Sequence, residues 1–165
     1  MSEPFSPPGQ EAIHNRLFAF EADFSGDLRC LPMAVRRKLD LAGVKLKLVH
    51  WHGLSAAERQ SLLQWKDDSR SLKAMGDWLL GRSHSLPEGP AKALEPARAC
   101  AWQQADTLPG DVALSCAQLG LQIDPQRWAC LDELQRFALI KLSHPGHEHR
   151  NMARALGEFG LLRGS

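Results

Sequence analysis

Apolar side chains recur at helical spacing after Pro32. Val35, Leu39 and Ala42 fall at positions i, i+4 and i+7, which places them on one face of a helix. Pro32 stands near the start, where its missing N–H is not needed, and Gly43 follows the last apolar position, where a left-handed cap is favoured. The pattern predicts a helix between the proline and the glycine.

The same arrangement returns 77 residues later. Eight of the thirty-five positions from Leu31 to Trp65 are identical to those from Leu108 to Leu142, including Trp51 with Trp128. The other identical pairs are Leu31 with Leu108, Pro32 with Pro109, Val35 with Val112, Gly43 with Gly120, Leu54 with Leu131, Arg59 with Arg136 and Leu62 with Leu139. A chance match at one of many shifts is the alternative. We interpret the two stretches as related helix–arm–helix repeats.

The second helix of each copy has a start signal in the sequence. Ser55 with Glu58, and Asp132 with Gln135, have the spacing of a capping box, in which each side chain satisfies the other residue's backbone N–H. Both copies are therefore predicted to end in a helix.

An arm joins the two helices of each copy. Residues 44–49 alternate apolar and polar side chains, which predicts a half-buried extended segment. The matching residues 121–123 are cut short by Asp124 and Pro125. The arms could form a short two-stranded pairing, which would need support from the surrounding helices. In an extended arm, His50 and His52 would face the same side.

The remaining segments complete a mainly α, single-domain prediction for residues 12–165. Residues 1–11 are rich in proline and small polar residues and are expected to be disordered. Prolines and glycines between about 82 and 98 predict a flexible connector. A terminal helix is expected to stop at Gly160.

Composition limits the classes of function. A formal net charge of +1 gives no global reason to bind nucleic acid or membrane, and no apolar run could span a bilayer. The first residues show no export signal, and the four cysteines are dispersed. We expect reduced thiols, a cytoplasmic location, and no nucleic-acid or membrane partner.

The tail of the second copy has a charged corner that the first copy lacks. Within it, His147, Glu148, Arg150 and Asn151 follow a Pro–Gly turn at the start of the last helix. Imidazole and carboxylate groups could bind a transition metal, but their spacing matches no standard zinc motif. A structural hydrogen-bond network and a contact with a partner or an anion are the alternatives. No metal site is predicted.

The second candidate is the basic run from residue 29 to 47. Its cations are Arg29, Arg36, Arg37, Lys38, Lys45 and Lys47, against the single acid Asp40. Such a patch could bind phosphate or an acidic protein surface, and the alternative is a solvated helix face beside a protected strand edge. Cys30, next to Arg29, could be a thiol of lowered pKa or a buried structural cysteine. No nucleophile elbow or phosphate loop is present, so no enzyme is predicted.

Three blocks of the sequence carry a resemblance to a known family. They are F-E-A-D-F at 20–24, L-R-C-L-P-M-A-V-R-R-K-L-D-L-A-G-V-K-L-K-L at 28–48 and R-F-A-L-I-K-L-S-H-P-G-H-E-H-R-N at 136–151, followed by E-F-G-L at 158–161. With these blocks the chain resembles the nitrate reductase-associated protein family.

The resemblance implies support of a cytoplasmic, assimilatory-type molybdenum nitrate reductase, without a defined molecular activity. Residues that follow the family's pattern are Glu21, Asp23, Arg29, Cys30, Pro32, Lys38, Asp40, Trp51, His147, Glu148, Arg150 and Asn151. His144 departs from the pattern and His149 looks variable, which weakens a metal site built from three histidines.

The leading hypothesis is an accessory protein that supports maturation, stability or activity of nitrate reductase by binding rather than by catalysis. Its expected contact surface is the basic run and the tail corner, facing the enzyme or a molybdopterin-type cofactor in transit. No cofactor of its own is expected. One alternative is a small metal-binding protein or metal-dependent enzyme that uses His147 and Glu148. Another is a ligand-sensing regulatory protein.

Overall fold

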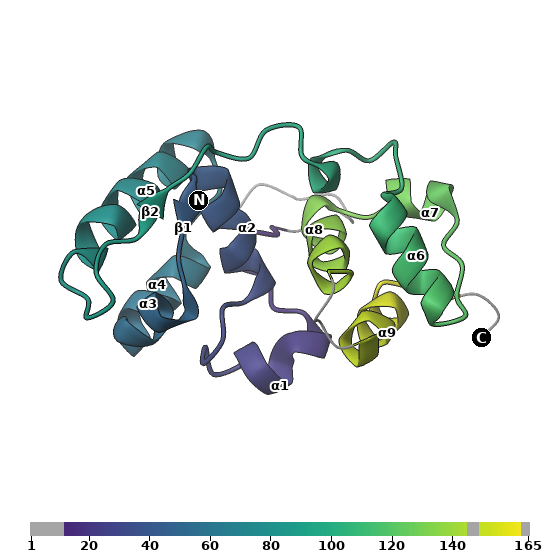
Figure 1. Ribbon diagram of the computed structural model, residues 1–165, viewed down its shortest axis with the longest axis horizontal. Coiled ribbons are helices and arrows are strands. Elements are labelled where there is room, and N and C mark those ends of the chain that lie inside the picture. Colours follow the sequence, from purple (N-terminus) through teal and green to yellow (C-terminus); the bar gives the residue numbers. More distant parts are fainter. Residues whose placement is uncertain (1–11, 145–148, 163–165) are drawn as a thin grey trace, which may run out of the picture.

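The chain folds mainly into helices, as predicted, in a computed structural model that describes residues 12–144 and 149–162 (Figure 1). The predicted disorder of residues 1–11 lies outside this range. The helices are η1 (Ala19–Glu21), α1 (Ala22–Ser25), α2 (Met33–Ala42), α3 (Leu48–Gly53), α4 (Ala56–Gln64), α5 (Ser69–Ser83), η2 (Ala101–Gln103), α6 (Gly110–Gln118), α7 (Pro125–Ala129), α8 (Glu133–Leu142) and α9 (His149–Glu158). Two short strands, β1 (Val44–Lys45) and β2 (Lys92–Ala93), form an antiparallel pair.

The predicted helix boundaries are set by local capping. Helix α2 follows Pro32 and ends at Gly43, whose φ of 76° is the left-handed conformation that glycine adopts without strain. The Ser55 hydroxyl accepts the Glu58 N–H at 3.1 Å, and the Glu58 carboxylate accepts the Ser55 N–H at 2.8 Å. Asp132 and Gln135 make the same reciprocal bonds at 2.7 and 3.0 Å at the start of α8. Both capping boxes are confirmed.

Element positions along the chain follow the 77-residue shift. Met33 at the start of α2 falls on Gly110 at the start of α6, and Ala56 at the start of α4 falls on Glu133 at the start of α8. Trp51 and Trp128 are both fully buried. Their hydrogen bonding differs. The Trp51 indole donates to the Leu28 carbonyl at 2.7 Å, whereas that of Trp128 has no hydrogen-bond partner within the described residues. The repeat itself stays a prediction.

The predicted extended arm and the pairing of the two arms are wrong. The strand in this arm is limited to β1, and its partner is β2 in the connector, with Val44 opposite Ala93 and Lys45 opposite Lys92. Helix α3 starts at Leu48 because the His50 ring accepts the Lys47 N–H at 3.0 Å, a local cap that competes with a strand. In the second copy, Pro125 opens α7 at the corresponding place. His50 and His52 therefore lie on a helix, not on one side of a strand.

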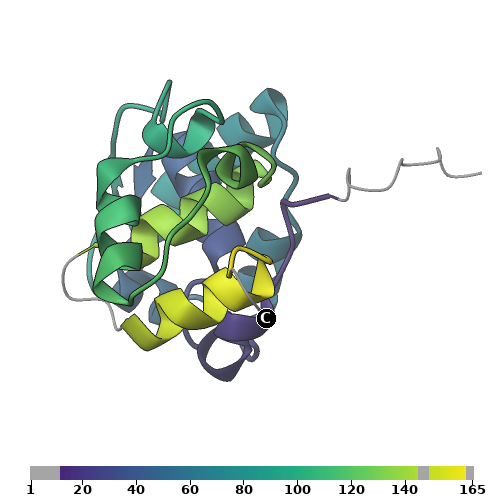
Figure 2. The same ribbon diagram turned by 90° about the vertical axis from the view of Figure 1, so that its right-hand side faces the viewer.

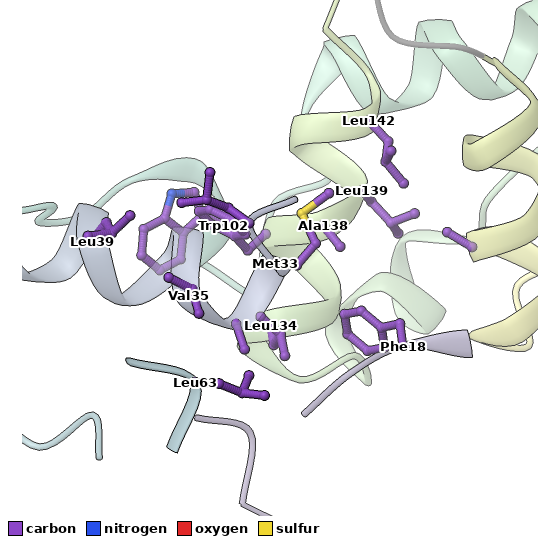
Figure 3. Close-up of a cluster of buried hydrophobic side chains, with 14 of the residues drawn as sticks. Phe18, Met33, Val35, Leu39, Leu63, Trp102, Leu134, Ala138, Leu139 and Leu142 are labelled. Atoms are coloured by element: carbon purple, nitrogen blue, oxygen red, sulfur yellow. The ribbon is translucent and has the colours of Figure 1, made fainter. Parts of the chain in front are cut away.

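Helix α8 runs through the middle of the molecule and organises its core. It packs against α2, α6, α9 and η2. Figure 3 shows Val35 and Leu39 of α2 gathered with Leu134 and Ala138 of α8 and with Trp102, and all five side chains are buried. Helices α3, α4 and α5 lie at one end of the molecule, and α6 and α7 at the other (Figure 1). The view in Figure 2 shows α9 running alongside the α8 layer.

Candidate functional site

Lys38, predicted as part of a basic surface, is fully buried. Its ammonium group donates to the carbonyls of Leu62, Leu63 and Trp65 at 2.6, 2.8 and 2.8 Å, at the C-terminal end of α4, where helix carbonyls lack the next turn's N–H donors. Burial lowers the pKa of Lys38 to about 7, against the attraction of Asp67. The side chain therefore caps a helix and is not available to a partner at the surface. Its position three residues after Val35, on the apolar face of α2, was the signal for burial.

Arg37 has a structural position for which the sequence analysis gave no signal. Its guanidinium contacts Asp67 at 2.9 Å and Glu133 at 2.9 Å, and its side chain is only 8% exposed. Because Glu133 opens α8, this pair of contacts joins α2 to the second half of the chain. Two of the six predicted cations are thus used inside the molecule.

Four cations of the run stay nearer the surface. Arg29 pairs with Asp27 at 2.8 Å and Lys47 with Glu88 at 3.2 Å, both between exposed side chains. Such exposed pairs contribute little stability and can exchange partners. Within residues 12–144 and 149–162, neither Arg36 nor Lys45 forms an ion pair with a carboxylate.

Arg36 and Lys45 line a small hollow beside α2, which we call the basic pocket. Its other charged members are Asp40 and Lys141, whose side chains approach to 3.5 Å, and its volume is about 160 Å³. Its apolar lining is Leu31, Leu39, Val44, Leu46 and Leu94. The pocket thus combines three cations and one carboxylate with an apolar lining, of which Leu31, Leu39 and Val44 are buried. Lys141 was missed as a site residue, although it lies within the third sequence block.

Glu21 is buried at the start of α2. Its Oε1 accepts the Met33 N–H at 3.2 Å, and its Oε2 has no hydrogen-bond partner among the described residues. Burial raises the pKa of Glu21 to about 7, and the hydrogen bonds from the backbone of Met33 and Phe18 oppose this rise, as does the charge of Arg36. Glu21 acts on the first turn of α2 rather than on the surface.

The first and last sequence blocks meet in space. The Glu158 carboxylate accepts the N–H groups of Ala19 and Phe20 at 3.0 and 2.8 Å, and Asp23 pairs with Arg154 at 3.4 Å. Helix α9 is thereby held against η1 and α1. Figure 2 shows α9 beside the N-terminal segment.

The tail corner is described only in part, because His147 and Glu148 lie outside the described residues. Arg150 and Asn151 lie in the first turn of α9, Arg150 exposed and Asn151 half-buried. Arg150 stands one helical turn before Arg154, so both lie on the side of α9 that meets α1.

The other candidates are held by backbone contacts. The Arg59 guanidinium lies 5.9 Å from the Trp51 ring and donates to the Trp51 carbonyl at 3.0 Å. The ring of His50 bonds to the Gly89 carbonyl at 3.0 Å and that of His52 to the Arg29 carbonyl at 2.9 Å. Cys30 is half-buried. In the part of the chain that the structure covers, no group of three His, Cys, Asp or Glu side chains could hold a metal ion.

Comparisons with known proteins add one family. A family model described as conserved nitrate reductase-associated protein matches residues 17–159, and so covers all three sequence blocks. No curated protein and no solved structure matches the chain. Among the described helices, none has the length and apolar character needed to cross a membrane.

Proposed function

The chain belongs to the family of conserved nitrate reductase-associated proteins, and from this we propose that it is an accessory protein of nitrate reductase. In this proposal it supports the maturation, stability or activity of a cytoplasmic, assimilatory molybdenum enzyme, and it acts by binding rather than by catalysis. The observation that carries the proposal is the basic pocket. There the second sequence block, through Arg36, Asp40 and Lys45, meets the third, through Lys141.

The chemistry of the pocket favours a protein partner. Cationic side chains that lack an intramolecular carboxylate partner attract an acidic surface and orient it during encounter. A volume of about 160 Å³ is smaller than the roughly 300–1,000 Å³ of pockets that enclose drug-sized ligands. We therefore place a protein surface ahead of a molybdopterin-type cofactor in transit as the bound species.

The proposed contact surface also includes candidate residues outside the pocket. Arg29, Lys47, Arg150 and Asn151 are at least partly accessible in the structure. They remain proposed contact residues, together with His147 and Glu148. Lys38, because it is buried, leaves the proposed surface.

Co-purification tests the proposal. We expect nitrate reductase to be captured from nitrate-grown cells by the wild-type chain. A triple charge reversal, Arg36→Glu with Lys45→Glu and Lys47→Glu, should abolish capture. Reversal of Arg127, an exposed residue of α7 at the other end of the molecule, is the matched control and should leave capture unchanged (Figure 1). Absence of nitrate reductase from the wild-type capture would refute the proposal.

A further inference from the structure

The basic pocket has a counterpart in the second half of the chain. Under the 77-residue shift, six of its lining positions fall on lining positions of a second hollow beside α6. The pairs are Leu31 with Leu108, Arg36 with Ala113, Asp40 with Ala117, Val44 with Leu121, Lys45 with Gln122 and Leu46 with Ile123. The two hollows therefore occupy corresponding places along α2 and α6 and along the segments that follow them.

The two hollows differ in their charged positions. The apolar positions stay apolar, whereas Arg36, Asp40 and Lys45 correspond to two alanines and a glutamine. Helix α6 nevertheless begins at the position that corresponds to the start of α2, and Gly120 has a φ of 74° where Gly43 has 76°. A unit of this kind forms without the three charges. The three charges are therefore not required for the helix to begin and end at these positions.

The basic pocket is also lined by two residues that lie outside the first repeat, and it is smaller than the second hollow. Leu94 from the connector and Lys141 from α8 line it, and its volume is about 160 Å³ against about 500 Å³ for the second hollow. Lys141 adds a third cation, while Asp40 orients it at 3.5 Å. The result is a small, net positive cup with an apolar wall.

We propose that the basic pocket receives a single carboxylate side chain from an acidic segment of the partner protein. The inference rests on the proposed function and specifies the chemistry of its site. The Arg36 Nε donates to the Leu31 carbonyl at 3.1 Å, which fixes the guanidinium while its two terminal nitrogens have no acceptor among the described residues. A guanidinium held in this way can bind a carboxylate through two parallel, charge-assisted hydrogen bonds. Lys45 and Lys141 supply further donors.

The apolar residues of the pocket would contact the side chain next to the bound carboxylate. Leu94 lines the pocket and is 50% exposed, and Leu46 is partly buried beside it. Beyond Leu46 the chain continues into Leu48 and Val49, which are 45% and 51% exposed. An acidic residue flanked by an apolar one fits this surface better than a uniformly charged segment, because burial of the apolar side chain excludes water from the ion pair.

The substitutions that test the pocket introduce residues that the second half of the chain has at the corresponding positions. Arg36→Ala with Lys45→Gln gives the first hollow the residues found at positions 113 and 122, so this variant is expected to fold. Thermal unfolding should confirm that it folds. If the double variant does not fold, Lys45→Gln alone replaces it, because Lys45 is exposed and forms no ion pair within the described residues. Gln122→Ala changes the second hollow and is the matched control.

Amide chemical shifts of the full chain report binding directly. The probe is a short peptide of alternating leucine and glutamate, compared with its leucine and glutamine analogue and with sodium nitrate and sodium phosphate. We expect the glutamate peptide alone to shift the amides around Arg36, Lys45 and Lys141. Its affinity should fall about tenfold or more in Arg36→Ala with Lys45→Gln, because charge-assisted hydrogen bonds are lost. Added salt should weaken it further.

Two results of the peptide experiment would overturn the inference. One is equal binding of the glutamine peptide. The other is saturable binding of nitrate or phosphate at these amides without binding of the glutamate peptide, which would make the pocket a small-oxyanion site. The proposed function fails separately. If wild type and the double variant capture nitrate reductase equally, the basic pocket is not the contact site, and the association with nitrate reductase stands. If the glutamate peptide binds but no nitrate reductase is captured, the pocket's preference for a carboxylate stands and the association with nitrate reductase is wrong.

Discussion

Replacing Glu21 by glutamine should change how the stability of the protein depends on pH. Glu21 is fully buried, and only one of its two carboxylate oxygens has a hydrogen-bond partner among the described residues. Glutamine keeps an oxygen that can accept the Met33 N–H at the start of α2, and it removes the negative charge. The substitution therefore separates the effect of the buried charge on the free energy of unfolding from the effect of the hydrogen bond that caps α2.

The sign and the size of the effect follow from the pKa. In the unfolded chain the carboxyl has its ordinary pKa of 4.5, and in the folded chain burial raises the pKa to about 7. Between these values the folded state binds more protons, so the free energy of unfolding falls as pH rises from 4.5 to 7 and is constant above. Over this shift the loss is about 3 kcal/mol. Glu21→Gln should therefore match the wild type near pH 4.5 and exceed it by about 3 kcal/mol at pH 8.

Urea unfolding at several pH values, followed by circular dichroism, measures this difference. Other titrating groups, including Lys38, are present in both proteins and largely cancel in the comparison. Glu21→Ala is the control for the cap, and it should lose about 1 kcal/mol at low pH because the Met33 N–H loses its acceptor. If the free energies of unfolding of wild type and Glu21→Gln change in parallel from pH 4.5 to 8, the explanation that burial raises the pKa of Glu21 is refuted.

Three further outcomes are expected. Lys38→Met should cost about 2–4 kcal/mol in chemical denaturation, because it leaves the carbonyls at the end of α4 without their donor, whereas Lys66→Met at an exposed site should change stability by less than about 0.5 kcal/mol. Equal losses at the two lysines would contradict the capping role. Trp51→Phe should destabilise the fold by about 1–3 kcal/mol more than Trp128→Phe, because only the indole of Trp51 has a hydrogen-bond acceptor in the described structure. Elemental analysis of untagged protein should find no stoichiometric transition metal, and an equimolar metal lost on His147→Ala would replace the binding proposal by the metal alternative.

Helix boundaries were predictable because their causes are short-range. Pro32 and Gly43 delimit α2, and the Ser55–Glu58 and Asp132–Gln135 boxes start α4 and α8 at the expected residues. The first arm was mispredicted because a short-range interaction was overlooked. Its alternating pattern indicated a strand, but a histidine cap at Lys47 starts a helix there, and period-two alternation over so few residues does not distinguish the two.

The candidate site was predictable only in part. Arg36 and Lys45 were recognised from local charge, but a charge pattern does not say which cations face the interior. The sequence run treats Lys38 and Lys45 alike, whereas the structure buries one against helix carbonyls and leaves the other exposed. Lys141 joins the pocket from α8, a helix distant along the chain, and no local spacing predicts that contact.

The sequence by itself determined a mainly helical chain, several of its helix ends and the family to which it belongs, because caps, periodicity and motif blocks act over a few residues. Only the tertiary structure decided that Lys38 is a buried cap and that Asp40 meets Lys141 beside Arg36. These contacts depend on how α2 packs against α8, and that packing is a property of whole surfaces rather than of neighbouring residues.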